Sequence, residues 1–167
     1  MAVQTRFGIS GWGTRRAGSF AGKVEASITD ATGSVFVSVE RMGPDGRAVR
    51  RYIVSWVASD NGDTVVEFGS SSAPFFVGQI YRVVTEPGAM VAPTDNYDIV
   101  LKNAIGVDVL NGALANRDTA NSEQVWIKDV WTNAHSQPVS THCRYRLKIT
   151  NAGAAGSGVC VIYTREG

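Results

Sequence analysis

Residues 48–68, AVRRYIVSWVASDNGDTVVEF, contain the pattern that decides the fold class. Every second residue from 52 to 58 is apolar, and in an extended chain these side chains point to one face. The residues on that face are Tyr52, Val54, Trp56 and Ala58. Asn61-Gly62 follows, and this dipeptide between two alternating stretches is a strong hairpin signal. We therefore predict two strands, joined by a tight turn at 60–63 and paired as a hairpin.

Short stretches of similar character flank this pattern on both sides. β-Branched, aromatic and alternating residues recur at 24–28, 34–40, 79–85, 97–102 and 125–130, as is typical of strands. Many of the 18 glycines and 5 prolines fall between them, at positions suited to turns. About nine short strands at a spacing of roughly 8–12 residues predict an all-β fold, either one β-sandwich or a barrel-like domain.

The end of the chain is predicted to be a second hairpin, with strands at 144–151 and 159–165 around a turn rich in glycine and alanine. In that hairpin Cys160 lies opposite Ile149, and Cys143 is six residues further along the strand. At about 3.3 Å per residue the two cysteines are about 20 Å apart, beyond the Cα limit of about 7 Å for a disulfide. We expect two free thiols, which fits synthesis in a reducing cytoplasm.

Two regions of the β domain, residues 24–167, leave its organisation open. Residues 113–124 show no alternation and could form one short helix, with Asp118 or Asn121 as its cap. Residues 89–96 form a connector between prolines, so a subdivision near 87–96 is possible. A sandwich of two halves and two smaller β units both fit this pattern.

Residues 1–23 form a distinct segment with four basic residues, no acidic residue and five glycines. No period of 2 or 3.6 runs through it, which predicts an extended basic and aromatic arm. Trp, Phe and Arg are enriched in protein interfaces, so we expect the arm to contact another subunit. The candidate interface residues are Arg6, Phe7, Trp12, Arg15, Arg16 and Phe20. A flexible terminus and an arm that stacks on nucleic-acid bases are the alternatives.

Composition and charge limit the class of protein further. The chain has 167 residues, 44% of them hydrophobic, and a net charge of +1, which argues against disorder and against a nucleic-acid-coating protein. The charge is unevenly distributed, because residues 1–23 have a net charge of +4 and the remaining residues a net charge of −3. No stretch has the apolar length of a membrane span or of a secretory signal. We therefore expect assembly in the cytoplasm and no membrane partner.

The sequence predicts neither a metal site nor a phosphate-binding loop. His135, His142 and Cys143 are too few for the four ligands of a structural zinc site. The glycines of residues 8–18 lack the third glycine of a dinucleotide fingerprint, since Arg16 stands in its place. We expect no metal and no cofactor.

Catalytic residues are also not recognisable. Residues 70–72 supply serines in a loop without the strand–turn–helix setting of a nucleophile elbow. Glu67 with Glu86, or Asp95 with Asp98, could serve as a carboxylate pair, but 15 scattered acids always offer such pairs. We therefore expect a protein that is not an enzyme.

A pattern rich in Asp, Asn and Gly runs through the C-terminal half. It comprises TDNYDIVL at 94–101, GVDVL at 106–110, Gly112, ANRD at 115–118, Leu147-x-Ile149-x-Asn151-Ala152-Gly153, Gly158, and Val161-Ile162-Tyr163. Over about 70 residues this pattern resembles small virion proteins of tailed bacteriophages. The resemblance implies a β-rich structural subunit on the capsid surface or at the neck and tail, and it brings no catalytic residues.

We accordingly expect a non-enzymatic structural subunit of a tailed bacteriophage virion. It would form homo-oligomers at the neck or tail, as in a head–tail connector, or on the head, and contact capsid, portal or tail proteins. Its place would be the virion, assembled in the bacterial cytoplasm, and nucleic acid is a disfavoured partner. The alternatives are a capsid decoration (cement) protein and a lectin-like module that binds host glycans through exposed aromatics such as Trp12, Trp126 or Trp131.

Overall fold

The computed structural model describes residues 26–30, 33–42, 49–70, 73–127, 137–138 and 143–165. Within these ranges the regular elements are all strands, with no helix, so the all-β prediction is confirmed. The strands are β1 (Ala26–Asp30), β2 (Gly33–Met42), β3 (Val49–Ala58), β4 (Thr64–Phe68), β5 (Gln79–Pro87), β6 (Asp98–Lys102), β7 (Glu123–Trp126), β8 (Gln137–Pro138), β9 (Tyr145–Thr150) and β10 (Ser157–Arg165). Side chains are described in eight of them, all except β1 and β8.

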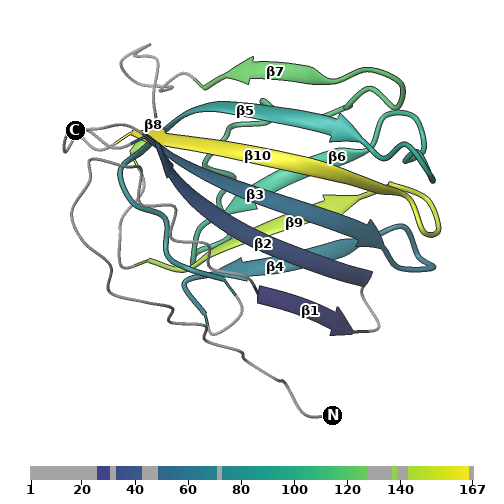
Figure 1. The fold of residues 1–167 in the computed structure, drawn as a ribbon, viewed down its shortest axis with the longest axis horizontal. Coiled ribbons are helices and arrows are strands. Elements are labelled where there is room, and N and C mark those ends of the chain that lie inside the picture. The colour runs from purple at the N-terminus through teal and green to yellow at the C-terminus, as the bar shows by residue number, and fades with distance from the viewer. Residues whose placement is uncertain are drawn as a thin grey trace, which may run out of the picture.

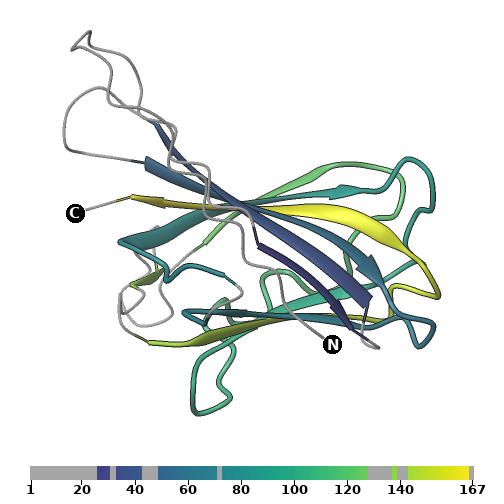
Figure 2. The ribbon, with the colours of Figure 1, turned by 60° about the horizontal axis from the view of Figure 1, so that its bottom comes forward.

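The strands form two antiparallel sheets that lie face to face (Figures 1 and 2). The seven-stranded sheet has the order β1-β2-β3-β10-β5-β7, with β8 paired to β5. The three-stranded sheet has the order β4-β9-β6. Both sheets have open edges in the described part of the chain, so the barrel-like alternative is wrong there. The layering is that of a β-sandwich.

One hydrophobic cluster lies between the sheets. The inward residues of β3 are the four that the alternation predicts, and their exposed fractions are only 0–4%, which confirms that face. The opposing sheet contributes Val66, Phe68, Ile99, Leu101, Leu147 and Ile149. Ile80 and Val83 of β5 join the same cluster, so core residues come from both sides of the 89–96 connector.

The turn at 60–63 joins two strands that do not pair with each other. β4 pairs with β9 in the three-stranded sheet, whereas β3 is paired on one edge to β2 and on the other to β10. Because both edges of β3 are taken by longer strands, β4 has no edge of β3 to join. The predicted hairpin is therefore wrong, and the turn carries the chain from one sheet to the other.

The predicted C-terminal hairpin is wrong for the same reason. β9 lies between β4 and β6, while β10 fills the position between β3 and β5. Residues 151–156 thus cross between the sheets and do not connect neighbouring strands. Both thiols are nevertheless free, as predicted: Cys143 is exposed, and Cys160 is buried on the inner face of β10.

The two crossing turns pack against each other at one end of the sheets. The N–H of Ala152 donates a hydrogen bond to the carbonyl oxygen of Gly62 at 2.9 Å. Gly62 has a φ of +79°, and a Cβ at this position would lie 2.8 Å from the main-chain nitrogen of Gly153. Glycine is required here by both the left-handed backbone and the close approach of a second main chain.

The stretch 113–124 forms turns, so the predicted short helix is wrong. Asp118 does cap a turn, but its carboxylate receives hydrogen bonds from the nearby Ala120 and Asn121 N–H groups outside any helix. The start of this stretch covers the edge of β6 that faces away from β9, because the N–H of Ile99 donates to the carbonyl oxygen of Leu114 at 3.0 Å. A strand edge satisfied by a loop is closed to further strands.

Candidate interaction surface

A row of large side chains crosses the outer face of the seven-stranded sheet, on the side away from the core. The register aligns one residue from each of five adjacent strands, which are in order Glu40, Arg51, Tyr163, Arg82 and Trp126. Side chains aligned in this way have their Cβ atoms roughly 4.5–5.5 Å apart. They therefore form a continuous strip, which we call the Arg–aromatic row.

An irregularity in β5 adds a third aromatic residue to this row. Tyr163 is aligned with Arg82, but the next residue, Thr164, is aligned with Ile80, so Tyr81 is an extra residue in β5. Ile80 and Val83 are both fully buried, which leaves Tyr81 and Arg82 together on the outer side. A β-bulge redirects side chains in this way. The row consequently holds three aromatic rings, and the Arg82 guanidinium group contacts two of them.

Arg82 packs among these rings. Its guanidinium carbon lies 3.8 Å from the ring centre of Tyr163 and 5.9 Å from that of Trp126. The ring centre of Tyr81 is 6.0 Å from that of Trp126, and the guanidinium carbon of Arg165 lies 5.9 Å from the Tyr81 ring. These distances are those of cation–π and aromatic contacts. Trp126 is still 52% exposed, so the cluster presents a broad aromatic surface.

The opposite end of the row is an ion pair between Arg51 and Glu40. The hydrogen bond to the Glu40 carboxylate is the main reason why the pKa of the Arg51 guanidinium is raised above its usual value. Both side chains remain about one-third exposed. One end of the row is therefore an ion pair, and the other end is an aromatic cluster in which Trp126 is exposed.

Two further rows of the same outer face consist mainly of small or apolar residues, with the exposed Gln124 and Glu86 at their ends. The register places Ser38, Ile53, Val161, Val84 and Gln124 in one row, and Phe36, Ser55, Val159 and Glu86 in the next. Although it points away from the core, Val161 is only 9% exposed. Antiparallel sheets that face water normally carry polar side chains on that side. This face has instead the composition of a surface that another group covers.

The outer face of the three-stranded sheet is different, because ion pairs dominate it. Arg146 pairs with Glu67 at 2.5 Å, and Lys148 pairs with Asp63 at 3.2 Å. Exposed pairs of this kind contribute little to stability but keep a surface soluble. The two outer faces therefore differ in character, and the one on the seven-stranded sheet is the candidate interaction surface.

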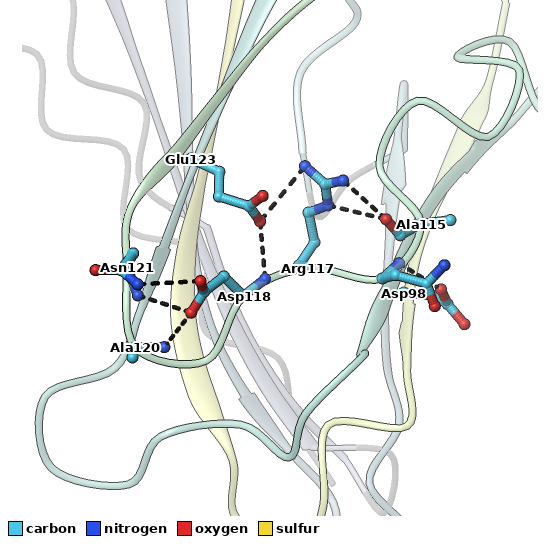
Figure 3. A network of polar contacts seen from close by, with 8 residues as sticks. Asp98, Ala115, Arg117, Asp118, Ala120, Asn121 and Glu123 are labelled. Carbon is cyan, nitrogen blue, oxygen red and sulfur yellow. Dashed lines mark hydrogen bonds and ion pairs between the residues drawn. The ribbon is translucent and has the colours of Figure 1, made fainter.

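Carboxylates organise the loops between β6 and β7 (Figure 3). The Asp118 carboxylate accepts hydrogen bonds from two main-chain N–H groups and from the amide of Asn121, and these bonds lower the pKa of Asp118. Glu123 accepts a hydrogen bond from the N–H of Asp118 at 2.8 Å and pairs with Arg117 at 3.5 Å. Arg117 in turn donates to the carbonyl oxygen of Ala115 at 2.8 Å. This network holds the chain in successive turns.

Two more carboxylates continue this network. Asp98 accepts hydrogen bonds from the N–H of Asn116 at 3.0 Å and from the amide of Asn151 at 3.2 Å. Asp108 accepts hydrogen bonds from three main-chain N–H groups at 2.7–3.3 Å. These residues belong to the pattern rich in Asp, Asn and Gly of the C-terminal half. In this chain the polar residues of that pattern shape loops.

The carboxylate pairs considered in the sequence are not brought together as reaction partners. Glu67 lies on the outer face of the three-stranded sheet and Glu86 on the outer face of the seven-stranded sheet, with the core between them. Asp95 accepts a hydrogen bond from the N–H of Asn96, while Asp98 is engaged by Asn116. Glu67 pairs with Arg146, and Glu86 is exposed.

Several predicted site residues lie outside the described part of the chain, and their assignments stay predictions. They are Arg6, Phe7, Trp12, Arg15, Arg16, Phe20, Trp131, His135 and His142. Of the aromatics considered for a glycan platform, Trp126 is described and exposed. In the ranges that the structure describes, no three His, Cys, Asp or Glu side chains are grouped so as to hold a metal ion.

Sequence reasoning missed most of the Arg–aromatic row. The sequence does not reveal that Arg82 and Tyr163 are neighbours, because the register of three strands far apart in the chain brings them together. One local signal exists. The alternation of 79–85 breaks at Tyr81-Arg82, where two large side chains follow one another between buried residues, as a bulge requires.

No protein-family model, no curated protein and no solved structure matches this chain. Among the described residues, no helix is long and apolar enough to cross a membrane. Fold and surface together define an all-β protein of two stacked sheets, with one charged outer face and one apolar and aromatic outer face.

Proposed function

We propose that this chain is a non-enzymatic structural subunit of a tailed bacteriophage virion, which forms homo-oligomers at the neck or tail. The contrast between the two outer faces is the observation that carries the proposal. Trp, Tyr and Arg, the residues that dominate interface energetics, are concentrated in the Arg–aromatic row. The charged face is suited to water and keeps the free subunit soluble.

Two further observations support a structural role. The resemblance to small virion proteins covers about 70 residues of the C-terminal half, and in that half the carboxylates of Asp98, Asp108 and Asp118 accept hydrogen bonds that hold loops in shape. Symmetric assemblies need subunits with a rigid body and a self-associating surface. A two-sheet body with closed loops and one apolar face meets that need.

The finer architecture belongs to the same proposal. Residues 24–167 form one β-sandwich of about nine strands, preceded by the arm of residues 1–23. Core residues from both sides of the 89–96 connector share one cluster, which supports a single domain over a subdivision near 87–96. The arm would bring Arg6, Phe7, Trp12, Arg15, Arg16 and Phe20 to another subunit.

The test is the location of the protein in purified particles of the phage that encodes it. Mass spectrometry of gradient-purified particles should detect the chain, and cryo-electron microscopy should place its density on the neck or tail axis. Density spread over the capsid lattice would favour the decoration alternative within the same class. Absence of the chain from purified particles would overturn the proposal.

A lectin-like role is the second candidate, and the exposed face of Trp126 beside Tyr81 and Arg82 favours it. Aromatic rings stack on the apolar faces of sugars, and a guanidinium group can donate hydrogen bonds to hydroxyl or carboxylate groups. A glycan array probed with the intact protein should then give binding that Trp126→Ala abolishes. An array without signal would remove this candidate.

A further inference from the structure

We propose that the outer face of the seven-stranded sheet is the docking surface for residues 1–23 of a neighbouring copy of this chain. The choice of a neighbouring copy over the chain's own arm rests on the proposed function, because a virion subunit must be held by its neighbours. The choice of this face and of this segment rests on the chemistry of both.

The face is suited to an occupant that carries apolar and aromatic side chains. The two rows beside the Arg–aromatic row are formed mainly by aliphatic and small residues, and Val161 is aligned with Val84 in the middle of the nearer row. Among its described residues the acids are Glu40, which pairs with Arg51, and the exposed Glu86, and the face also carries Arg82 and Arg165. An occupant rich in aromatic residues would bury its rings on the apolar rows and beside the Arg–aromatic row.

Residues 1–23 have this composition. They supply Phe7, Trp12 and Phe20, together with four basic residues and no acidic one. Five glycines allow an extended backbone to lie close to a sheet.

The length and starting point of the segment also fit. It precedes β1, an edge strand of this same sheet, so it leaves the fold beside the face concerned. Six strands span about 24 Å at a spacing of about 4.8 Å. An extended chain covers about 26 Å between residues 12 and 20, at about 3.3 Å per residue. Trp12 and Phe20 can therefore contact opposite edges of one face while the remaining residues reach back to their own subunit.

The experiment uses the full chain with Trp12 replaced by photoreactive p-benzoylphenylalanine. Isotopically heavy and light protein are mixed, irradiated and digested, and the cross-linked peptides are identified by mass spectrometry. We expect heavy–light cross-links from position 12 to β5, β10 or β7. Cross-links confined to one isotopic form, cross-links to β4, β6 or β9, or no cross-links at all would each overturn the proposal.

A pair of matched substitutions tests the face directly. Val84 and Val100 are both half-buried valines, on the outer faces of the seven-stranded and three-stranded sheets respectively. Val84→Lys should reduce heavy–light cross-linking and the oligomeric fraction at least tenfold, whereas Val100→Lys should change neither. Equal effects of the two substitutions would overturn the proposal. The unsubstituted cross-linking result stands whether or not either variant folds.

The same results separate this proposal from the proposed function. Heavy–light cross-links to the predicted face, in a protein that is absent from purified particles, would keep the docking surface and overturn the virion assignment. A protein that is found in particles but cross-linked only within single copies would keep the virion assignment and overturn the docking surface.

Discussion

Gly62 needs to be glycine for two reasons, its left-handed backbone and the close approach of a second main chain. Gly112, in another turn, shares only the first of these reasons and so allows the two effects to be measured separately. Gly62 and Gly112 have similar φ values, +79° and +73°, but only Gly62 has another main chain within contact distance of a Cβ. We expect Gly112→Ala to lower the free energy of unfolding by about 1 kcal/mol, because alanine is strained in the left-handed backbone conformation and meets no other atom there. Gly62→Ala should cost roughly 3 kcal/mol, because the close contact adds overpacking. Urea denaturation of both variants measures the difference, and equal losses would contradict the packing of the two turns.

The two cysteines provide a second test at the scale of single residues. Burial raises the pKa of the Cys160 thiol to about 12, while Cys143 is exposed. We expect Ellman's reagent at pH 8 to modify one thiol per native chain and two in urea. Cys143→Ser should then remove the native reaction entirely. Two reactive thiols in the native protein would show that the core opens near β10.

The pH dependence of stability follows from the same burial. The folded-state pKa of Cys160 lies above its ordinary value of 9.0, and burial likewise raises the pKa of Tyr97 to about 12. Above pH 9 the unfolded chain releases these protons while the folded chain keeps them, so the unfolded state binds fewer protons. We therefore expect the free energy of unfolding to fall as the pH rises from about 9 to 12. A flat profile over this range, measured by urea denaturation, would contradict the burial of both groups.

Among the elements, the loop after β6 depends most clearly on one side chain. Asp108 accepts hydrogen bonds from the N–H groups of Leu101, Leu110 and Gly112. We expect Asp108→Ala to cost about 1–3 kcal/mol, because partly buried donors lose their acceptor. Amide exchange along β6 should also accelerate. Asp95→Ala, which removes a single exposed contact, serves as the control and should stay within about 0.5 kcal/mol.

The same scale shows why the sequence predicted strands well and their partners poorly. Alternation is local, so the buried face of β3 could be assigned from residues 52–58 alone. Which strands pair depends on distant parts of the chain that can occupy the same strand edge. Asn61-Gly62 favours a hairpin of β3 and β4, but β2 and β10 occupy both edges of β3. The candidate surface was hidden for the same reason, since Tyr163, Arg82 and Trp126 become neighbours only through that long-range register.

For the molecule as a whole, the last strand in sequence is central in space. All nine residues of β10 align with β3, and eight of them align with β5 (Figure 1). Without β10 the seven-stranded sheet divides into two parts, and the core loses the buried Cys160 and Ile162. The sheet that carries the candidate surface therefore cannot be completed until the C-terminal residues are available, and long-range pairing of this kind makes folding slow.

We expect a chain that ends at Gly156 to lack cooperative folding, because two strands would each lose a full-length partner at the centre of a sheet. Removal of residues 166–167 alone, which follow β10, should leave the stability unchanged and provides the control. Far-UV circular dichroism, limited proteolysis and a thermal melt distinguish the two truncations. A cooperative melt of the 1–156 chain would mean that β3 and β5 can close the sheet between them.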